Sequence, residues 1–182
     1  MQKAEKRFGP DADFALSRID LALAEGASDE DLSADLADLH SATDLVRIGL
    51  TSGTRPRFDR LVPLTTPTPI TNGPLVSVIV PAYRAEATLD TCLRGLTAQS
   101  WRNLEIIVVD DASPDNTIEV AERAAKADPR IRIVRHRENS GAYVARNTGL
   151  SEVRGDFFTV HDSDDWSHPQ KIEQQVMPLL DD

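Results

Sequence analysis

Residues 104–111 read Leu-Glu-Ile-Ile-Val-Val-Asp-Asp, a mostly apolar and β-branched run that ends in two carboxylates. A near-continuous apolar run of this kind is typical of a strand buried on both faces of a parallel sheet. Residues 75–80, Leu-Val-Ser-Val-Ile-Val, have the same character and are closed by Pro81. Two such runs in one chain predict the centre of a parallel sheet.

Helical patterns separate these runs from one another and from two further strand patterns. The alternation of strand and helix predicts an α/β fold, in which right-handed crossovers join parallel strands. Ligands in such sheets bind outside the C-terminal ends of the strands. The expected helices cover residues 88–98, 117–127 and 142–151, a last helix begins near Ser167, and the further strands cover residues 131–134 and 157–160.

Polar or conformationally special residues follow every expected strand. If the fold is correct, these strand ends lie on one edge of the sheet, where a ligand would bind. The four strand ends carry Pro81-Ala82-Tyr83, Asp110-Asp111, His136-Arg137 and Asp162-Ser163-Asp164.

The last strand end is the most acidic, because residues 159–166 read Thr-Val-His-Asp-Ser-Asp-Asp-Trp. In extended geometry Asp162 and Asp164 point to one side and Ser163 to the other, so two carboxylates can meet one ion. Mg²⁺ and Mn²⁺ prefer oxygen ligands, and Mg²⁺ often keeps substrate phosphates in its shell. An isolated D-x-D in an acidic chain is more often a solvated turn, so the neighbouring strand ends are what favour a metal site at Asp162 and Asp164.

The composition excludes several classes of protein. The chain has 182 residues and a formal net charge of −10, which disfavours nucleic acid as a partner because phosphate contacts require clustered Lys and Arg. The single cysteine, Cys92, excludes an internal disulfide and fits a reducing compartment. No apolar run approaches the ~18 residues of a membrane span, and residues 1–10 lack the apolar core of a secretion signal. We expect a cytoplasmic protein and leave peripheral membrane association open.

Three segments differ in composition. Residues 1–50 predict an amphipathic helical hairpin, with helices over residues 11–26 and from Ser28 to Gly49. This hairpin would pack on its own domain, on a further part of a longer protein, or on another subunit. Residues 51–73 are rich in Pro and Thr and predict an extended, irregular linker. Residues 74–182 hold the α/β domain.

Several well-known sites are absent from the sequence. No G-x-G-x-x-G and no G-x-x-x-x-G-K-[ST] follows an expected strand, and nothing resembles a nucleophile elbow, a zincin helix or paired Cys ligands. What remains is a carboxylate pair, a second acidic strand end and Arg146 on a nearby expected helix. These groups suit a diphosphate bridged by a cation, which would stabilise negative charge on a leaving group. Asp110 or Asp111 could accept hydrogen bonds from a base N–H or a ribose hydroxyl.

Five sequence blocks, in this order and spacing, resemble family 2 glycosyltransferases over about residues 75–177. The resemblance implies a GT-A fold, with a Rossmann-like, mostly parallel sheet sandwiched by helices. It also implies a nucleotide-diphosphosugar donor, with a UDP-sugar favoured, a Mn²⁺ or Mg²⁺ ion, and inversion at the anomeric carbon. The acceptor would be a glycan, a lipid or a cell-envelope polymer. The blocks are residues 76–83, 99–101, 105–113, 139–149 and 162–169.

The resemblance also implies residue roles. The residues after the first strand would line the nucleoside pocket, and Asp111 would meet the base, which is uracil in many members. Asn139 and Arg146 would lie near the diphosphate, although a surface ion pair for Arg146 and a strand cap for Asp110 remain alternatives. The implied donor-binding residues are Pro81, Ala82, Tyr83, Asp110, Asp111, Asn139, Arg146, Asp162 and Ser163, and the implied metal ligands are Asp162 and Asp164.

The acceptor half and the catalytic base of the family, an Asp or Glu, follow well after the D-x-D motif. Here a single expected helix separates that motif from Asp182, so the base is expected beyond Asp182 and no residue present is assigned to it. We expect the donor-binding part of a larger transferase, with little transfer by these residues alone. The alternatives are a non-catalytic nucleotide-binding scaffold whose hairpin docks a partner, and a nucleotidyltransferase, whose phosphate loop is absent.

Overall fold

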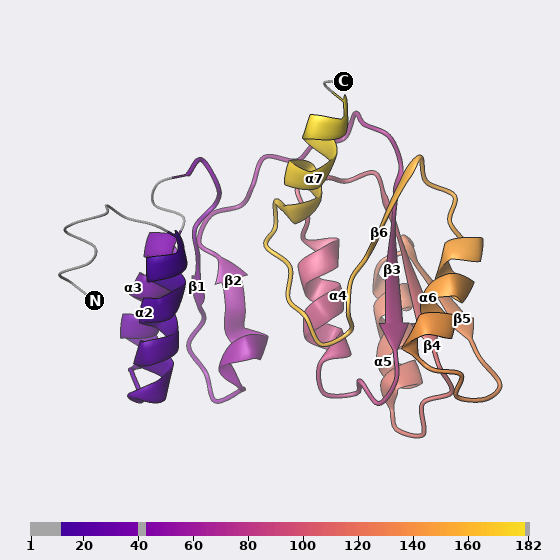
Figure 1. Ribbon diagram of the computed structural model, residues 1–182, viewed down its shortest axis with the longest axis horizontal. Coiled ribbons are helices and arrows are strands. Elements are labelled where there is room, and N and C mark those ends of the chain that lie inside the picture. The colour runs from indigo at the N-terminus through magenta and orange to yellow at the C-terminus, as the bar shows by residue number, and fades with distance from the viewer. Residues whose placement is uncertain (1–11, 40–42, 181–182) are drawn as a thin grey trace. The chain divides into compact units, whose positions relative to one another are not determined.

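The computed structural model describes residues 12–39 and 43–180 (Figure 1). The chain divides into two compact units, Met1–Pro67 and Thr68–Asp182. No helix in the described part of the chain is both long and apolar enough to cross a membrane.

The first unit begins with the predicted pair of helices, α2 (Ala12–Ala24) and α3 (Asp29–Leu39). An ion pair joins them, with Arg18 Nη2 3.1 Å from Asp35 Oδ1. Ser28 caps α3, because its Oγ accepts a 3.1 Å hydrogen bond from the Asp31 N–H, and Oγ in turn donates to the Asp31 carboxylate at 2.7 Å. The first of these bonds is the N-cap half of the capping box expected of Ser followed by an acidic residue three positions later, whereas the second joins the two side chains and not the Asp31 carboxylate to the Ser28 backbone N–H.

The prediction that the second helix continues to Gly49 is wrong. The helix ends at Leu39, residues 40–42 lie outside the described residues, and Ile48–Leu50 forms strand β1. At Gly49 the strand comes close to α3, since a Cβ there would lie 2.6 Å from Ser33 Oγ, and the Leu50 N–H donates to the same oxygen at 3.1 Å. This packing selects a strand where the apolar spacing alone suggested a helix.

The expected linker, residues 51–73, is also more ordered than its composition predicts. It contains a 3-10 helix, η1 (Arg57–Arg60), and strand β2 (Leu61–Pro63), which pairs antiparallel with β1. Arg60 is buried and donates hydrogen bonds to the Thr51 and Arg55 carbonyls, both at 2.9 Å. These contacts fold the Pro-rich segment back on itself. The predicted domain limits at residues 50 and 73 stay a prediction.

The second unit confirms the α/β prediction. Its four strands are all parallel, in the order β5-β4-β3-β6, and β6 is therefore an edge strand. Val76 in β3 lies opposite Leu104 in β4 and Phe157 in β6. On β6, Phe158 and Val160 are 55% and 37% exposed. The strands are β3 (Val76–Ala82), β4 (Leu104–Asp110), β5 (Ile131–Arg135) and β6 (Phe157–Val160).

Helices cover both faces of this sheet (Figure 1). The face of Val78 and Val80 packs on α4 (Leu89–Thr97), α5 (Thr117–Ala127) and α7 (Lys171–Leu180). The opposite face, with Ile107 and Val109, packs on Ala145 of α6 (Ala142–Ser151). This is the GT-A architecture that the sequence resemblance implies, and burial on both faces explains why β3 and β4 are continuously apolar.

Candidate functional site

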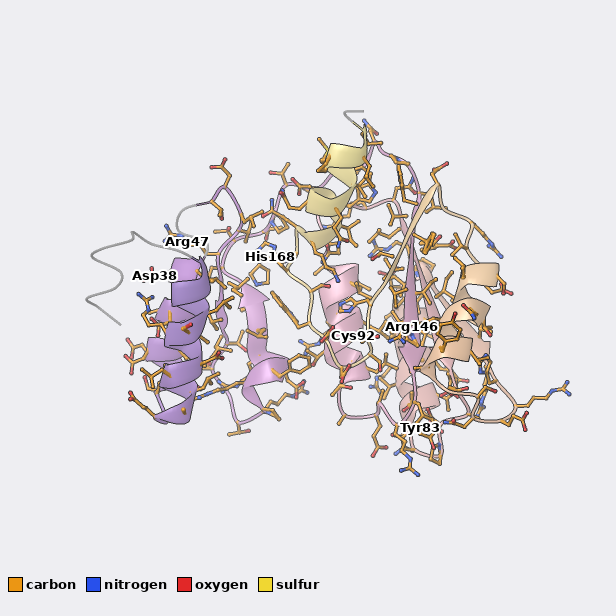
Figure 2. The ribbon with its side chains drawn as sticks, in the orientation of Figure 1. Asp38, Arg47, Tyr83, Cys92, Arg146 and His168 are labelled. Atoms are coloured by element: carbon orange, nitrogen blue, oxygen red, sulfur yellow. The ribbon has the colours of Figure 1, made fainter. Side chains whose placement is uncertain are left out.

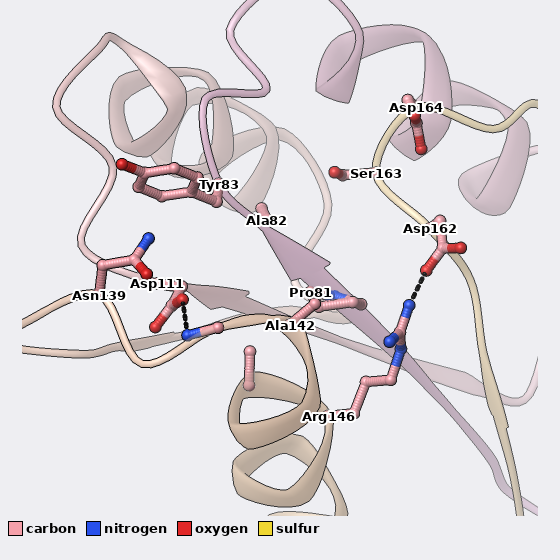
Figure 3. A pocket seen from close by; sticks show the side chains of 12 residues that line it. Pro81, Ala82, Tyr83, Asp111, Asn139, Ala142, Arg146, Asp162, Ser163 and Asp164 are labelled. Carbon is pink, nitrogen blue, oxygen red and sulfur yellow. Dashed lines mark hydrogen bonds and ion pairs between the residues drawn. The ribbon is translucent and has the colours of Figure 1, made fainter.

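A pocket of about 340 Å³ opens at the edge where the parallel strands end (Figure 3). Its walls come from the C-terminal end of β3, from residues that follow β3, β4 and β6, and from α6 with the loop that precedes it. Three small residues of α6 and its preceding loop, Gly141, Ala142 and Ala145, also line it and were not predicted. The pocket brings together the predicted residues Pro81, Ala82, Tyr83, Asp111, Asn139, Arg146, Asp162, Ser163 and Asp164.

Asp110 does not line this pocket. Its side chain is fully buried, and Oδ1 accepts a 3.2 Å hydrogen bond from the Ser113 N–H. Its Oδ2 lies 3.5 Å from Arg135 Nε. Asp110 therefore caps the turn after β4, which is the alternative that the sequence had left open.

Asp111 points its carboxylate at the loop that leads into α6 (Figure 3). Oδ1 accepts the Ser140 N–H at 2.9 Å and lies 2.7 Å from His136 Nδ1, and Oδ2 accepts the Gly141 N–H at 2.7 Å. Burial by itself would raise the pKa of Asp111, but these hydrogen bonds outweigh it and the pKa is lowered. The ionised carboxylate thus fixes one wall, and about one of its four lone-pair positions remains for a ligand.

Two residues without glycine's freedom adopt positive φ beside the pocket, Arg84 at 53° and Ala112 at 54°. Such conformations persist where the surroundings determine them, and they cluster at functional sites. The Arg84 N–H donates to Ser113 Oγ at 3.2 Å, which ties the two turns together, and the Arg84 guanidinium lies 5.4 Å from the Tyr83 ring centroid. These turns set the direction in which the chain leaves β3 and β4. Nothing in the sequence pattern predicted them.

Arg146 lies on α6 (Figure 2), and its side chain points toward Asp162 of the D-x-D segment (Figure 3). Its Nη2 lies 2.7 Å from Asp162 Oδ1, and the two side chains are 39% and 50% exposed. The predicted cation and one predicted metal ligand are therefore in direct contact. The sequence left two interpretations of Arg146 open, a residue near the diphosphate and a surface ion pair. In the structure Arg146 both lines the pocket and forms an ion pair.

The start of the D-x-D segment is anchored by His161. Its backbone N–H donates to the Ile79 carbonyl at 2.9 Å, and its Nε2 lies 2.6 Å from Ser167 Oγ. Burial, followed by the charge of Lys171, lowers the pKa of His161 to about 4, so the ring is neutral near pH 7. A neutral, buried ring holds the base of the loop that carries Asp162.

The far end of the same loop is anchored by Gln99, which is completely buried. Its Nε2 donates to the His168 carbonyl at 2.7 Å, and its Oε1 accepts the Ile172 N–H at 3.0 Å. The neighbouring Ser100 N–H donates to the Pro169 carbonyl at 2.7 Å. The sequence resemblance included this Gln-Ser block without a role, and its place beside the D-x-D loop supplies one.

The pocket offers two carboxylates for a metal, Asp162 and Asp164. Within residues 12–39 and 43–180, no three or more His, Cys, Asp or Glu side chains are arranged to hold a metal ion. Mg²⁺ sites at substrate phosphates commonly use only one or two carboxylates, with waters and phosphate oxygens completing the shell. The donor set therefore fits an ion that a bound diphosphate completes, and does not fit an all-protein cage.

Comparison with known proteins identifies relatives over this unit. The sequence model described as Glycosyl transferase family 2 matches residues 77–182. The putative glycosyltransferase EpsH of Bacillus subtilis (strain 168) is 40% identical over 109 residues, covering 60% of this chain and 31% of that protein. The putative teichuronic acid biosynthesis glycosyltransferase TuaG of the same organism is 41% identical over 108 residues, covering 59% and 43%. The chain spans less than half the length of these curated relatives.

Two solved structures share the fold. S. aureus TarS 1-349, in complex with UDP-GlcNAc, superposes with a TM-score of 0.56 at 28% identity, over 59% of this chain and 31% of that chain. The mannosyltransferase PcManGT from Pyrobaculum calidifontis, in complex with GDP-Man and Mn²⁺, gives a TM-score of 0.50 at 30% identity, over 58% and 32%.

Proposed function

Because the chain belongs to glycosyl transferase family 2, we propose that its strand-end pocket binds the nucleotide-diphosphosugar donor of a sugar transfer. The proposal is supported mainly by the way that separate segments of the chain meet at this pocket. Residues from four separate segments, which the resemblance assigned to donor and metal, meet around one cavity of about 340 Å³. A chance D-x-D turn would not gather Tyr83, Asp111 and Arg146 around it.

The donor would lie along the pocket with its base near the β3 and β4 ends. Pro81, Ala82 and Tyr83 would flank the nucleoside, and Asp111 would offer its remaining lone pair to a base N–H. The diphosphate would lie near Arg146, the cation that faces the D-x-D segment. Related structures hold UDP-GlcNAc and GDP-Man, and we favour a UDP-sugar for this chain.

Asp162 and Asp164 would hold Mn²⁺ or Mg²⁺ together with the diphosphate, and Ser163 would contact the donor beside them. The Mn²⁺ in the PcManGT structure supports this part of the proposal. When bound, such an ion neutralises the diphosphate and stabilises negative charge as it becomes the leaving group. Asp162 and Asp164 supply oxygen ligands, and Arg146 supplies a further positive charge to the phosphate oxygens.

Transfer to an acceptor would need more than these residues. We propose that the sugar passes with inversion to a glycan, lipid or cell-envelope polymer, with the catalytic base beyond Asp182. We propose that the reaction takes place in the cytoplasm, because a reducing compartment would keep the single cysteine, Cys92, as a free thiol. The isolated 182 residues would bind donor and metal with little or no transfer.

Calorimetric titration tests the donor site. UDP, GDP and dTDP would be titrated into the wild type and into Asp164→Ala, with and without Mn²⁺. A matched control is Asp20→Ala, which removes an exposed carboxylate from α2. We expect metal-dependent nucleotide binding that Asp164→Ala abolishes and Asp20→Ala retains. Absence of binding by any nucleotide would favour a non-catalytic scaffold, and robust transfer by these residues alone would contradict the assignment of the base.

A further inference from the structure

Arg146 forms an ion pair with Asp162, the carboxylate that would bind the metal ion of the donor. We infer that Arg146 substitutes for the ion at Asp162 until a diphosphate arrives, and so couples metal binding to nucleotide binding. This inference rests on the proposed function, because it requires a pocket that takes both a diphosphate and a divalent ion.

Arg146 and Asp162 project from different elements, a helix and a loop. Arg146 projects from α6, which lies close against the sheet because Gly149 allows Ile79 to approach, and a Cβ at Gly149 would lie 2.3 Å from Ile79 Cγ2. Asp162 lies in the loop after β6. Both side chains are partly exposed and both line the pocket. The ion pair can therefore separate by side-chain rotation, without unfolding α6 or the loop after β6.

The charges explain why the pair would oppose an ion in the empty pocket. The guanidinium Nη2 is 2.7 Å from Asp162 Oδ1, and Mg²⁺ binds its oxygen ligands at about 2.0–2.1 Å. An ion sharing Asp162 would therefore lie close to a positive charge and be repelled by it. An ion taking the carboxylate alone would have to displace Arg146.

A diphosphate removes this conflict. Phosphate oxygens accept hydrogen bonds from the planar guanidinium group of arginine. Arg146 can therefore move from Asp162 to the diphosphate, which leaves the Asp162 carboxylate available to the ion. The nucleotide then raises the affinity for the metal. By thermodynamic linkage, the metal raises the affinity for the nucleotide by the same factor.

Removing the Arg146 charge therefore has opposite effects on the two ligands. Mn²⁺ alone should bind Arg146→Gln more tightly than wild type, whereas UDP in the presence of Mn²⁺ should bind it more weakly. A purely structural role would weaken both ligands. A role confined to binding phosphate would weaken UDP and leave Mn²⁺ alone unchanged.

The test measures free Mn²⁺ by electron paramagnetic resonance and UDP by calorimetry, on the full 182-residue chain. The variants are Arg146→Gln, Arg146→Lys and the charge-matched control Arg137→Gln, an exposed arginine outside the pocket lining. For Arg146→Gln we expect the Mn²⁺ dissociation constant to fall about three- to tenfold and the UDP constant to rise about tenfold. Arg146→Lys keeps the charge and should leave Mn²⁺ binding near wild type, and Arg137→Gln should change neither constant.

A double variant separates this mechanism from a general effect of charge. If Arg146 acts through Asp162, adding Asp162→Asn to Arg146→Gln should abolish the gain in Mn²⁺ affinity. An unchanged or weaker Mn²⁺ affinity in Arg146→Gln, with wild type binding both ligands, would overturn this inference alone. If wild type bound neither UDP nor Mn²⁺, the proposed function would fail as well.

Discussion

Gln99 and His168 are joined by a 2.7 Å hydrogen bond from the Gln99 side-chain amide to the His168 backbone carbonyl. Gln99 lies two residues after the end of α4 and is completely buried, whereas His168 follows the D-x-D segment. A core amide thus determines where the acidic loop ends. The position of the candidate metal ligands depends on a residue that never reaches the pocket.

Replacing Gln99 by Met should reduce stability. The His168 carbonyl and the Ile172 N–H would lose their buried partner, at about 1–3 kcal/mol for each unsatisfied group. Urea denaturation should show an unfolding free energy lower by about 2–6 kcal/mol. The control Gln175→Met, at an exposed site on α7, should change it by less than about 0.5 kcal/mol. Equal effects of the two substitutions would contradict the anchoring role.

Asp111→Asn should give a stability loss that depends on pH. At pH 7 we expect a loss of about 1–3 kcal/mol, because three hydrogen bonds to a carboxylate are weakened. The pKa of Asp111 is lowered in the folded chain, so its contribution is present above the unfolded value of about 3.9 and disappears as the pH falls through the folded value. Urea denaturation between pH 7 and pH 3 should therefore show the difference from wild type shrinking only below about pH 4. The control Glu122→Gln, at an exposed site on α5, should change the free energy of unfolding at pH 7 by less than about 0.5 kcal/mol.

Asp29 in the first unit should titrate far below the ordinary range. The hydrogen bond from Arg60, followed by that from Arg57, holds the pKa of Asp29 at about 2. Arg60→Gln should raise this pKa, and Arg57→Gln should raise it less, as carboxyl NMR titration would measure. Arg47→Gln, at an exposed position, should leave it unchanged. Since the folded value is depressed, the stabilisation is present above the unfolded pKa and disappears as the pH falls toward 2.

Gly149→Ala should destabilise the chain, although alanine is the better helix former by about 1 kcal/mol. The added Cβ would lie 2.3 Å from Cγ2 of buried Ile79 and 3.3 Å from Val109 Cγ2. Overpacking of this kind typically costs about 1–3 kcal/mol, measurable by thermal or urea denaturation. Asn147→Ala, exposed on the same helix, should be neutral or mildly stabilising. A neutral Gly149→Ala would mean that α6 can move away from β3.

The sequence predicted the second unit well because its main signals are local. A strand buried on both faces must be apolar along its length, so β3 and β4 could be recognised without knowing their neighbours. Parallel strands end at one edge, and this rule alone grouped Tyr83, Asp111 and the D-x-D segment.

The features that the sequence did not predict depend on tertiary contacts. Strand β1 forms because Gly49 lets the chain approach Ser33, a contact that helical spacing cannot indicate. Asp110 and Asp111 are adjacent and chemically identical, so the sequence does not distinguish their roles. In the structure Asp110 accepts the Ser113 N–H in a buried turn, whereas Asp111 accepts the Gly141 N–H beside the pocket. The positive φ of Ala112 gave no signal, because the residue is not glycine.

The position of β6 at the end of the sheet has a practical consequence. Its outer edge carries no strand in the described part of the chain, and Phe158 and Val160 remain exposed beside it. An unpaired edge strand with exposed apolar side chains is a template on which another polypeptide can add a strand. Preparations of this chain should therefore form higher-order species as they are concentrated, and light scattering across a dilution series would define the range in which a binding isotherm reports on single molecules.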